Sequence, residues 1–147
     1  MNSALPLAGT VVLDVSRMLP GAVLARTLVD LGARVVKVED PRSGDPMRVT
    51  PPLVGGTGAG FLAFFRGVES VAIDLKAPAG AAALRKMARH ADVLVESFRP
   101  GTLERWDLGY DRLAALNPGL VVVSLSSFGS EGPDADRIGH DLNFTAV

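Results

Sequence analysis

The sequence has 147 residues, of which 48% are hydrophobic and 21% are charged, and its net charge is −1. This length fits one domain with a buried core, and the near-zero charge gives no electrostatic reason to expect binding to nucleic acid or to an anionic membrane. The absence of cysteine excludes disulfides and thiolate metal sites, and no apolar segment approaches the 18 residues that a membrane span needs. We therefore expect a soluble, cytoplasmic protein.

The start of the chain predicts a strand, a helix and a second strand. Apolar runs at residues 10–15 and 34–38 are typical of buried strands. The segment between them has a proline near its start, a glycine at its end, and leucines at i, i+4 and i+7 that predict one buried helical face: Leu24, Leu28 and Leu31. Such a unit is expected to be right-handed, with its two strands parallel.

Three further strands are predicted near residues 70–75, 92–96 and 120–126. Helical patterns separate them, and the helix that follows Pro78 has its core positions at Leu84, Met87, Ala88 and Ala91. The glycine-rich segment 50–60 is expected to be a mobile lid or loop without a phosphate cradle. Alternating strands and helices predict an α/β fold, a Rossmann-like, doubly wound parallel sheet with helices on both faces.

A Rossmann-like sheet invites comparison with dinucleotide-binding proteins, but the sequence does not support NAD binding. The first strand-to-helix turn, residues 16–21, has one glycine where the fingerprint needs three. No residues suggest a covalently bound cofactor.

His140 is the first candidate for chemistry. It follows Gly139 and precedes Asp141, in the loop that leaves the last predicted strand, and ligands of open α/β sheets bind beyond such strand ends. A Ser-His-Asp hydrolase is not indicated, because the chain has no G-x-S-x-G elbow. A metal site is not indicated either, because His90 is the only other histidine and ends a predicted core helix.

Several cations also follow predicted strand ends. Lys76, Arg99 and Arg105 would together suit a ligand with several phosphates, although solvated surface charge is the alternative for each. Three more cations near the ends of the first two strands could add to this site: Arg17, Lys37 and Arg42.

Motifs along nearly the whole chain resemble the N-terminal part of the class III CoA-transferase family, which includes the α-methylacyl-CoA racemases. The segments that carry the resemblance are residues 30–39, 41–45, 73–76, 91–101, 117–119 and 139–144. The resemblance implies a Rossmann-like large domain, an acyl-CoA thioester as substrate and an interlocked homodimer in the full-length protein.

The resemblance also implies roles for single residues. Lys76 and Arg105 match positions that line the CoA phosphates and adenine end, and Arg99 is a weaker match of the same kind. Arg137 lies just before the active-site segment, in which His140 matches the acid–base histidine of the racemase branch and Asp141 its neighbour. Asp40 replaces an arginine that many members place against the nucleotide, and Arg42 is a candidate substitute.

The Gly-His-Asp triplet favours the racemase branch, with proton transfer at the α-carbon of a 2-methylacyl-CoA thioester. Histidine suits one proton-transfer role because its unperturbed pKa is about 6.5. The alternatives are CoA transfer between carboxylic acids through an aspartyl–acyl anhydride, and a non-catalytic fragment that binds CoA.

The chain is expected to be truncated. The resemblance places the second catalytic residue, an aspartate, beyond Val147, and the apolar end of the sequence indicates a chain cut inside an element. Residues 1–147, the N-terminal part of a large domain, are therefore expected to be inactive alone and marginally stable.

Overall fold

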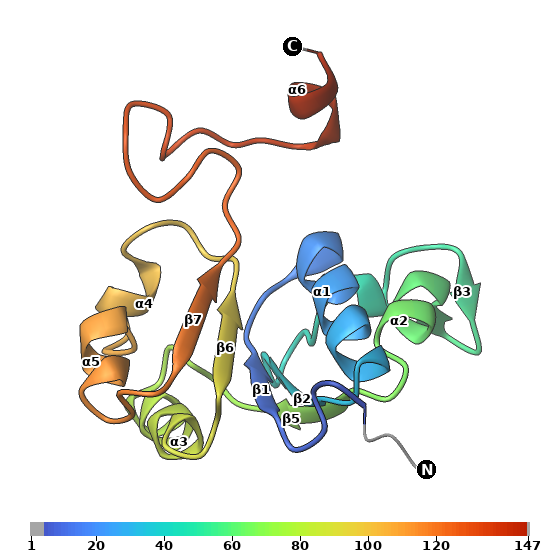
Figure 1. The fold of residues 1–147 in the computed structure, drawn as a ribbon. Helices are drawn as coiled ribbons and strands as arrows, with labels where there is room; N and C mark the ends of the chain where they lie inside the picture. Colours follow the sequence, from blue (N-terminus) through green and yellow to red (C-terminus); the bar gives the residue numbers. More distant parts are fainter. Residues whose placement is uncertain (1–4, 147) are drawn as a thin grey trace.

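Residues 5–146 are described by a computed structural model, and they form one parallel sheet covered by helices (Figure 1). The strands of the sheet are β1 (Val11–Asp14), β2 (Arg34–Glu39), β5 (Glu69–Ala72), β6 (Val93–Glu96) and β7 (Val121–Ser124). Their order is β5-β2-β1-β6-β7, and every neighbouring pair is parallel. All five predicted strands and their parallel arrangement are thus confirmed.

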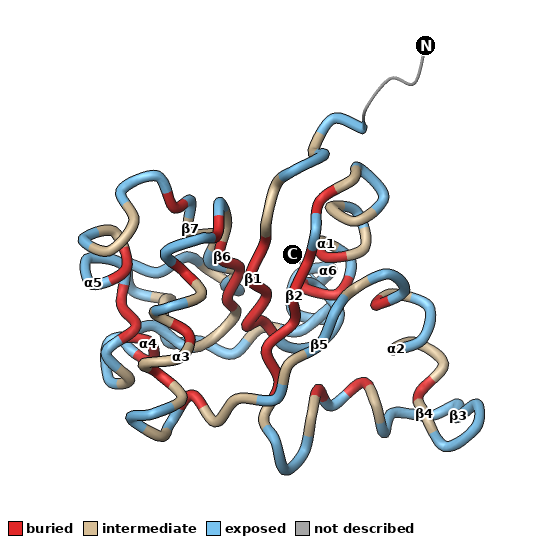
Figure 2. Tube along the Cα trace, turned by 90° about the horizontal axis from the view of Figure 1, so that it is seen from below, coloured by how far each residue is buried: buried red, intermediate tan, exposed pale blue. Residues whose placement is uncertain are grey.

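Helices cover both faces of the sheet, as the sequence predicts. Successive side chains of a strand point to opposite faces, so Val12 and Leu13 of β1 enter two separate apolar clusters. The Val12 cluster lies under α1 (Met18–Asp30) and α2 (Ala59–Phe64). The Leu13 cluster lies under α3 (Pro78–Ala88), α4 (Thr102–Arg105) and α5 (Tyr110–Ala114). Figure 2 shows the buried residues concentrated along β1, β2 and β6 at the centre.

The buried face of α1 differs from the prediction. Its fully buried residues are Gly21, Ala22 and Ala25, whereas Leu31 keeps 39% of its surface exposed. Small side chains let the helix approach the sheet closely, so the leucines lie at the margin of the contact rather than at its centre. On α3 the prediction is confirmed for Leu84 and Ala88, which are completely buried, and for Ala91, just past the helix, which is 4% exposed; Met87 is only partly buried against the same cluster.

The segment predicted as a mobile loop contains regular structure. A 3-10 turn, η1 (Pro46–Arg48), precedes the short antiparallel pair β3 (Leu53–Val54) and β4 (Thr57–Gly58), and α2 follows directly. A Cβ at Gly58 would lie 2.1 Å from the Met47 carbonyl oxygen, so the glycine is needed for close backbone approach.

Strand β5, the third strand predicted from the sequence, ends earlier than predicted, at Ala72 rather than at Leu75. The Asp74 carboxylate accepts a hydrogen bond of 3.0 Å from the Lys76 N–H, a local turn that competes with extended structure. The first turn of α3 then packs on Asp74, because a Cβ at Gly80 would lie 1.9 Å from the Asp74 carbonyl oxygen.

The chain after β7 leaves the carboxyl edge of the sheet and carries the short helix α6 (Asp141–Thr145) above it (Figure 1). We call residues 125–146 the C-terminal arm. Several of its apolar side chains are exposed, among them Ile138 (65%) and Leu142 (78%). The arm therefore lies beyond the strand ends, as the sequence predicts.

Candidate functional site

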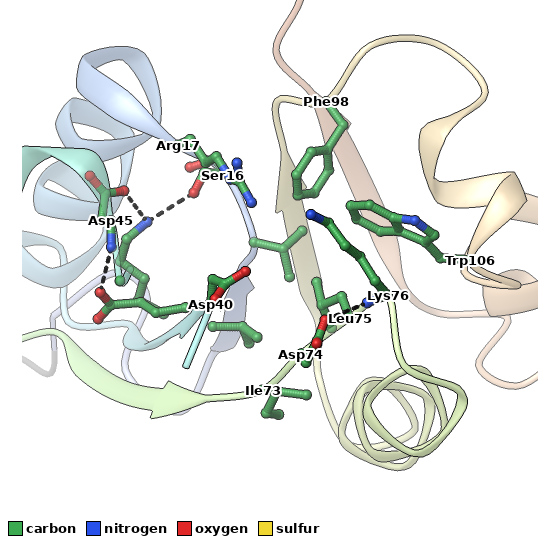
Figure 3. Close-up of a pocket in the computed structure, with 15 residues that line it drawn as sticks. Ser16, Arg17, Asp40, Asp45, Ile73, Asp74, Leu75, Lys76, Phe98 and Trp106 are labelled. Carbon is green, nitrogen blue, oxygen red and sulfur yellow. Dashed lines mark hydrogen bonds and ion pairs between the residues drawn. The ribbon is translucent and has the colours of Figure 1, made fainter. Parts of the chain in front are cut away.

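A cleft opens at the carboxyl edge of the sheet (Figure 3). Strand order reverses between β1 and β6, and in open α/β sheets ligands bind at this reversal. Loops from both of these strands border the cleft, together with the ends of β2 and β5. The residues around it are Val15, Ser16, Arg17, Lys37, Val38, Glu39, Asp40, Gly44, Asp45, Ile73, Asp74, Leu75, Lys76, Phe98 and Trp106.

Lys37 closes the floor of the cleft as part of a buried ion network. Its side chain is 2% exposed, and its ammonium lies 3.1 Å from an Asp45 carboxylate oxygen and 3.4 Å from one of Asp14. It also donates a hydrogen bond of 2.9 Å to the carbonyl oxygen of Ser16 and lies 4.5 Å from the ring centre of Phe65. The expectation that Lys37 could bind a phosphate is therefore wrong, because two carboxylates already neutralise it.

Glu39 anchors the second half of this network. Its carboxylate accepts hydrogen bonds from Arg48 (2.7 Å), from the Ser70 hydroxyl (2.5 Å) and from the Asp45 N–H (2.9 Å). Burial would by itself raise the pKa of Glu39, but these hydrogen bonds outweigh it and lower the pKa to about 2. For Asp14 the balance is the opposite, since burial raises its pKa despite the nearby Lys37 and Ser16.

One wall of the cleft is aromatic. Phe98 and Trp106 pack edge to face with their ring centres 5.0 Å apart, and Arg17 lies over Phe98 with its guanidinium carbon 5.4 Å from the ring centre. The Lys76 side chain extends beside both rings in Figure 3. This wall can cover an apolar part of a ligand while cations meet its charged part.

Lys76 and Arg105 lie together, as expected for residues that follow strand ends on one edge. They border a second hollow, which is joined to the cleft through Lys76 and Trp106 and is also bordered by Arg85 and Asp107. Arg105 donates a hydrogen bond of 2.8 Å to the Thr102 hydroxyl, whereas Arg85 is paired with the Asp107 carboxylate at 2.7 Å. Two cations without a carboxylate partner in the described chain, Lys76 and Arg105, therefore remain around this hollow and suit a ligand with phosphate groups.

Arg42 lies at the rim of the cleft and is already paired. Its guanidinium is 3.4 Å from Asp40 and 3.5 Å from Asp74, two residues that border the cleft. The hydrogen bonds from Arg42 lower the pKa of Asp40. Arg42, the candidate substitute for the family's arginine, is therefore paired with Asp40, the residue that occupies the position of that arginine.

Arg99 and Arg137 border a third hollow, between the loop after β6 and the C-terminal arm. Both side chains are exposed; Arg137 pairs with Asp134 at 3.0 Å, and its guanidinium carbon lies 5.4 Å from the ring centre of Phe128. Phe98 borders both this hollow and the cleft, but neither arginine borders the cleft itself.

His140 and Asp141 lie on the arm, where both are exposed. The His140 N–H donates a hydrogen bond of 2.9 Å to the Asn143 side chain, so the residue caps α6. His140 does not border the cleft of Figure 3, and its catalytic role stays a prediction.

Within residues 5–146, no group of three or more histidine, cysteine or acidic residues could hold a metal ion. In the same part of the chain, no helix has the length and apolar character to cross a membrane.

Sequence reasoning missed the aromatic wall and the ion network. Phe98 and Trp106 are separated by seven residues and another turn, so no local pattern joins them. A signal for the network was present, because Asp14, Lys37 and Glu39 interrupt or end apolar strands, where a charge must be paired if it is buried.

Residues 7–147 match the family described as CoA-transferase family III. The chain is 42% identical over 135 residues to the succinyl-CoA–D-citramalate CoA-transferase of Chloroflexus aurantiacus, covering 91% of this chain and 34% of that protein. It is 37% identical over 148 residues to the succinyl-CoA:glutarate CoA-transferase of Homo sapiens, covering 100% of this chain and 34% of that protein. The solved structure of a CAIB/BAIF family protein from Brucella suis superposes with a TM-score of 0.91 and 38% identity, over 98% of this chain and 39% of that one.

These relatives correct one expectation. The Gly-His-Asp triplet favours the racemase branch, but both named relatives are CoA-transferases and support CoA transfer, the alternative to racemisation. The chain spans about a third of the length of the curated relatives that it matches (34% for both). The extent of the match, the identities and the shared fold show that the chain belongs to CoA-transferase family III.

Proposed function

We propose that this protein transfers coenzyme A from an acyl-CoA thioester to a free carboxylic acid. The observation that carries the proposal is the cleft at the point of strand reversal, where Lys76 and an aromatic wall lie side by side. CoA has a polyphosphate nucleotide at one end and a largely uncharged arm at the other. The two joined hollows match this division: Lys76 and Arg105 border one of them, and the rings of Phe98 and Trp106 border the other.

Lys76 and Arg105 are proposed to bind the CoA phosphates, with Arg85 bordering the same hollow. A lysine is a compact point charge, whereas the guanidinium of arginine can bind two phosphate oxygens at once. Arg42, Arg99 and Arg137 are assigned weaker roles, because Arg42 and Arg137 already have carboxylate partners and Arg99 borders the hollow beneath the arm.

The proposed chemistry proceeds through an anhydride. A carboxylate oxygen attacks the thioester carbonyl carbon, the carbon–sulfur bond breaks, and the CoA thiolate leaves. The thiolate then attacks the carbonyl on the protein side of the anhydride, so that CoA moves to the protein carboxyl group and the first acid is released. The carboxylate of the second acid attacks this thioester, expels the thiolate again and forms a second anhydride. Attack of the thiolate on the acyl carbonyl of that anhydride yields the new acyl-CoA and frees the protein carboxylate. The resemblance implies that the attacking carboxylate is an aspartate outside residues 1–147, and the contribution of the present residues is to bind and orient the thioester.

Dicarboxylic acids are the proposed substrates, because the named relatives act on succinyl-CoA with citramalate or glutarate. The test is to incubate the full-length protein with succinyl-CoA and labelled glutarate and to measure labelled glutaryl-CoA. Lys76→Ala and Arg105→Ala should reduce CoA affinity, and His140→Ala should change the transfer rate little.

A second measurement distinguishes the racemase chemistry. A 2-methylacyl-CoA substrate is incubated in D₂O, and deuterium at the α-carbon is measured by mass spectrometry. Exchange that requires His140, without formation of labelled glutaryl-CoA, would refute the proposed transfer.

A homodimer is part of the proposal. The exposed apolar side chains of the C-terminal arm, such as Ile138 and Leu142, would be covered by a second subunit or by further chain. Light scattering of the purified protein measures its mass, and a monomer at micromolar concentration would contradict the dimer.

A further inference from the structure

We propose that Arg17 is an oxyanion-binding residue of the cleft, held in position by a buried clamp that consists of Asp14, Ser16 and Lys37. The inference rests on the proposed function, because the oxyanion is either a phosphate of CoA or the carboxylate of the acid that receives CoA. We refer to the three buried residues as the Ser16 clamp.

The charges around the cleft leave Arg17 available. Four acidic residues border the cleft, and within residues 5–146 each has a cationic partner: Glu39 pairs with Arg48, Asp45 with Lys37, and Asp40 and Asp74 with Arg42. Three cations border the cleft: Arg17, Lys37 and Lys76. Of these, Lys37 is ion-paired with Asp14 and Asp45. Among the described residues, neither Arg17 nor Lys76 has a carboxylate within ion-pair distance.

Arg17 and Lys76 approach the cleft from opposite sides. Figure 3 shows the Arg17 guanidinium and the Lys76 ammonium pointing toward one another, with Phe98 beside both. A positively charged opening of this kind attracts an anion, and the guanidinium can donate two parallel hydrogen bonds to a carboxylate or phosphate.

The Ser16 clamp fixes the turn that carries Arg17. The Asp14 carboxylate accepts hydrogen bonds from the Ser16 N–H (2.9 Å) and the Ser16 hydroxyl (2.5 Å), and Lys37 donates to the Ser16 carbonyl oxygen (2.9 Å). The Arg17 N–H donates to the Ser97 hydroxyl at 2.8 Å, which ties the turn to the loop after β6. These hydrogen bonds occupy the N–H groups of Ser16 and Arg17 and the carbonyl oxygen of Ser16, and they restrict the motion of the turn.

The backbone just after Arg17 adopts an energetically unfavourable conformation. Met18 has a φ of +65°, a left-handed conformation that is costly for a residue with a side chain and persists only where its surroundings enforce it. On the other side, a Cβ at Gly21 would lie 1.7 Å from the Ser16 hydroxyl oxygen, so α1 is pressed directly against the clamp. The backbone at Arg17 is therefore fixed before a ligand binds, and the Arg17 side chain rests on Phe98, which reduces the entropy lost on binding.

The first experiment removes the charge of Arg17. Arg17→Met keeps most of the length of the side chain, Arg17→Lys keeps the charge without the planar fork, and Arg89→Met is the matched control. Arg89 is exposed at the C-terminal end of α3, just before β6 begins, and it borders none of the three hollows described above. Calorimetry with CoA and steady-state transfer from succinyl-CoA to glutarate are measured for each variant of the full-length protein.

Loss of a charged hydrogen bond predicts that Arg17→Met weakens binding at least about tenfold, with a partial recovery in Arg17→Lys and no change in Arg89→Met. A higher Kd for CoA would identify the oxyanion as a CoA phosphate. A higher KM for glutarate at unchanged CoA affinity would identify it as the carboxylate of the acid. Changes below twofold in both quantities would overturn the inference, whereas a wild-type protein that binds no CoA would refute the proposed function itself.

The second experiment tests the clamp through a double-mutant cycle. Ser16→Ala removes the hydroxyl that bonds to Asp14 and leaves no charge without a partner. If the clamp positions Arg17, Ser16→Ala weakens the same binding step by about threefold or more in the wild type, and by much less in an Arg17→Met background. A purely structural role would lower the thermal midpoint of unfolding equally in both backgrounds and weaken binding independently of Arg17, and that result would overturn the positioning role.

Discussion

Replacing Lys37 by methionine should destabilise the protein more than any single change at its surface. Methionine nearly preserves the length and volume of the side chain, so the packing near Phe65 is retained. What is lost is the charge between two carboxylates, those of Asp14 and Asp45, each on a side chain that is 1% exposed. The carbonyl oxygen of Ser16 also loses a donor at 2.9 Å.

The expected loss of unfolding free energy can be estimated from what happens when one partner of a buried ion pair is removed. Removing one partner leaves a buried charge without compensation and typically costs about 3–5 kcal/mol. The whole stability of a domain is about 5–15 kcal/mol, so this single change removes a large part of it. Neutralising the carboxylates as well, in Lys37→Met combined with Asp14→Asn and Asp45→Asn, should restore most of the loss.

Urea unfolding of the full-length protein is the assay, followed by far-UV circular dichroism. With an m-value near 2 kcal/mol/M, a loss of about 4 kcal/mol lowers the urea midpoint by about 2 M at unchanged m. The pH dependence gives a second criterion. Burial already raises the pKa of Asp14, and removing Lys37 raises it further, so Asp14 of the variant takes up its proton at a higher pH in the folded state than in the unfolded state.

This proton uptake stabilises the folded variant as pH falls, and the stabilisation is lost as pH rises through the folded pKa. The deficit of Lys37→Met should therefore be smaller at pH 5 than at pH 8. A deficit below about 1 kcal/mol, or one that does not change with pH, would refute the view that Lys37 compensates buried carboxylates.

Further predictions concern stability and binding. Glu39 has a folded pKa of about 2 and an ordinary value of 4.5, so its contribution of about 3 kcal/mol is fully present above pH 4.5 and is lost as pH falls toward 2; unfolding of Glu39→Gln should lack this acid-dependent loss. Gly80→Ala should lower the thermal midpoint by several degrees, because its methyl group would meet the Asp74 carbonyl oxygen at 1.9 Å, and an unchanged midpoint would contradict this packing. Lys76→Ala or Arg105→Ala should weaken CoA binding by about 1.5–3 kcal/mol in calorimetry, and unchanged affinity in both would reject their assignment. The 147-residue chain expressed alone should aggregate or unfold at low urea because apolar arm residues are exposed; a cooperative monomeric transition would contradict this.

The sheet could be predicted from the sequence because its signal is local. Strands covered on both faces are continuous apolar runs, and the helices between them force parallel pairing, so β1, β2, β6 and β7 lie where the runs at residues 10–15, 34–38, 92–96 and 120–126 predict them. The convergence of Lys76 and Arg105 follows from the same rule, since both come after strand ends on one edge.

The exceptions have physical causes that a local pattern does not contain. The leucine spacing of α1 predicts a helix correctly but not the depth of its contact, which alanine and glycine side chains determine by allowing close approach. Strand β5 ends early because the Asp74 carboxylate accepts a hydrogen bond from the Lys76 N–H. The glycine-rich segment 50–60 is ordered because Gly58 packs against the Met47 backbone.

The sequence by itself determined the fold class, the family and the edge of the sheet at which we propose that CoA binds. Only the tertiary structure decided which charges remain available there. Arg17 and Lys37 are both cations near strand ends, yet Lys37 is neutralised by Asp14 and Asp45, whereas no carboxylate of the described chain lies within ion-pair distance of Arg17. The contact between Arg17 and Ser97 joins residues 80 positions apart. Burial and pairing of a charge depend on such distant neighbours, and a periodic pattern along the chain carries no information about them.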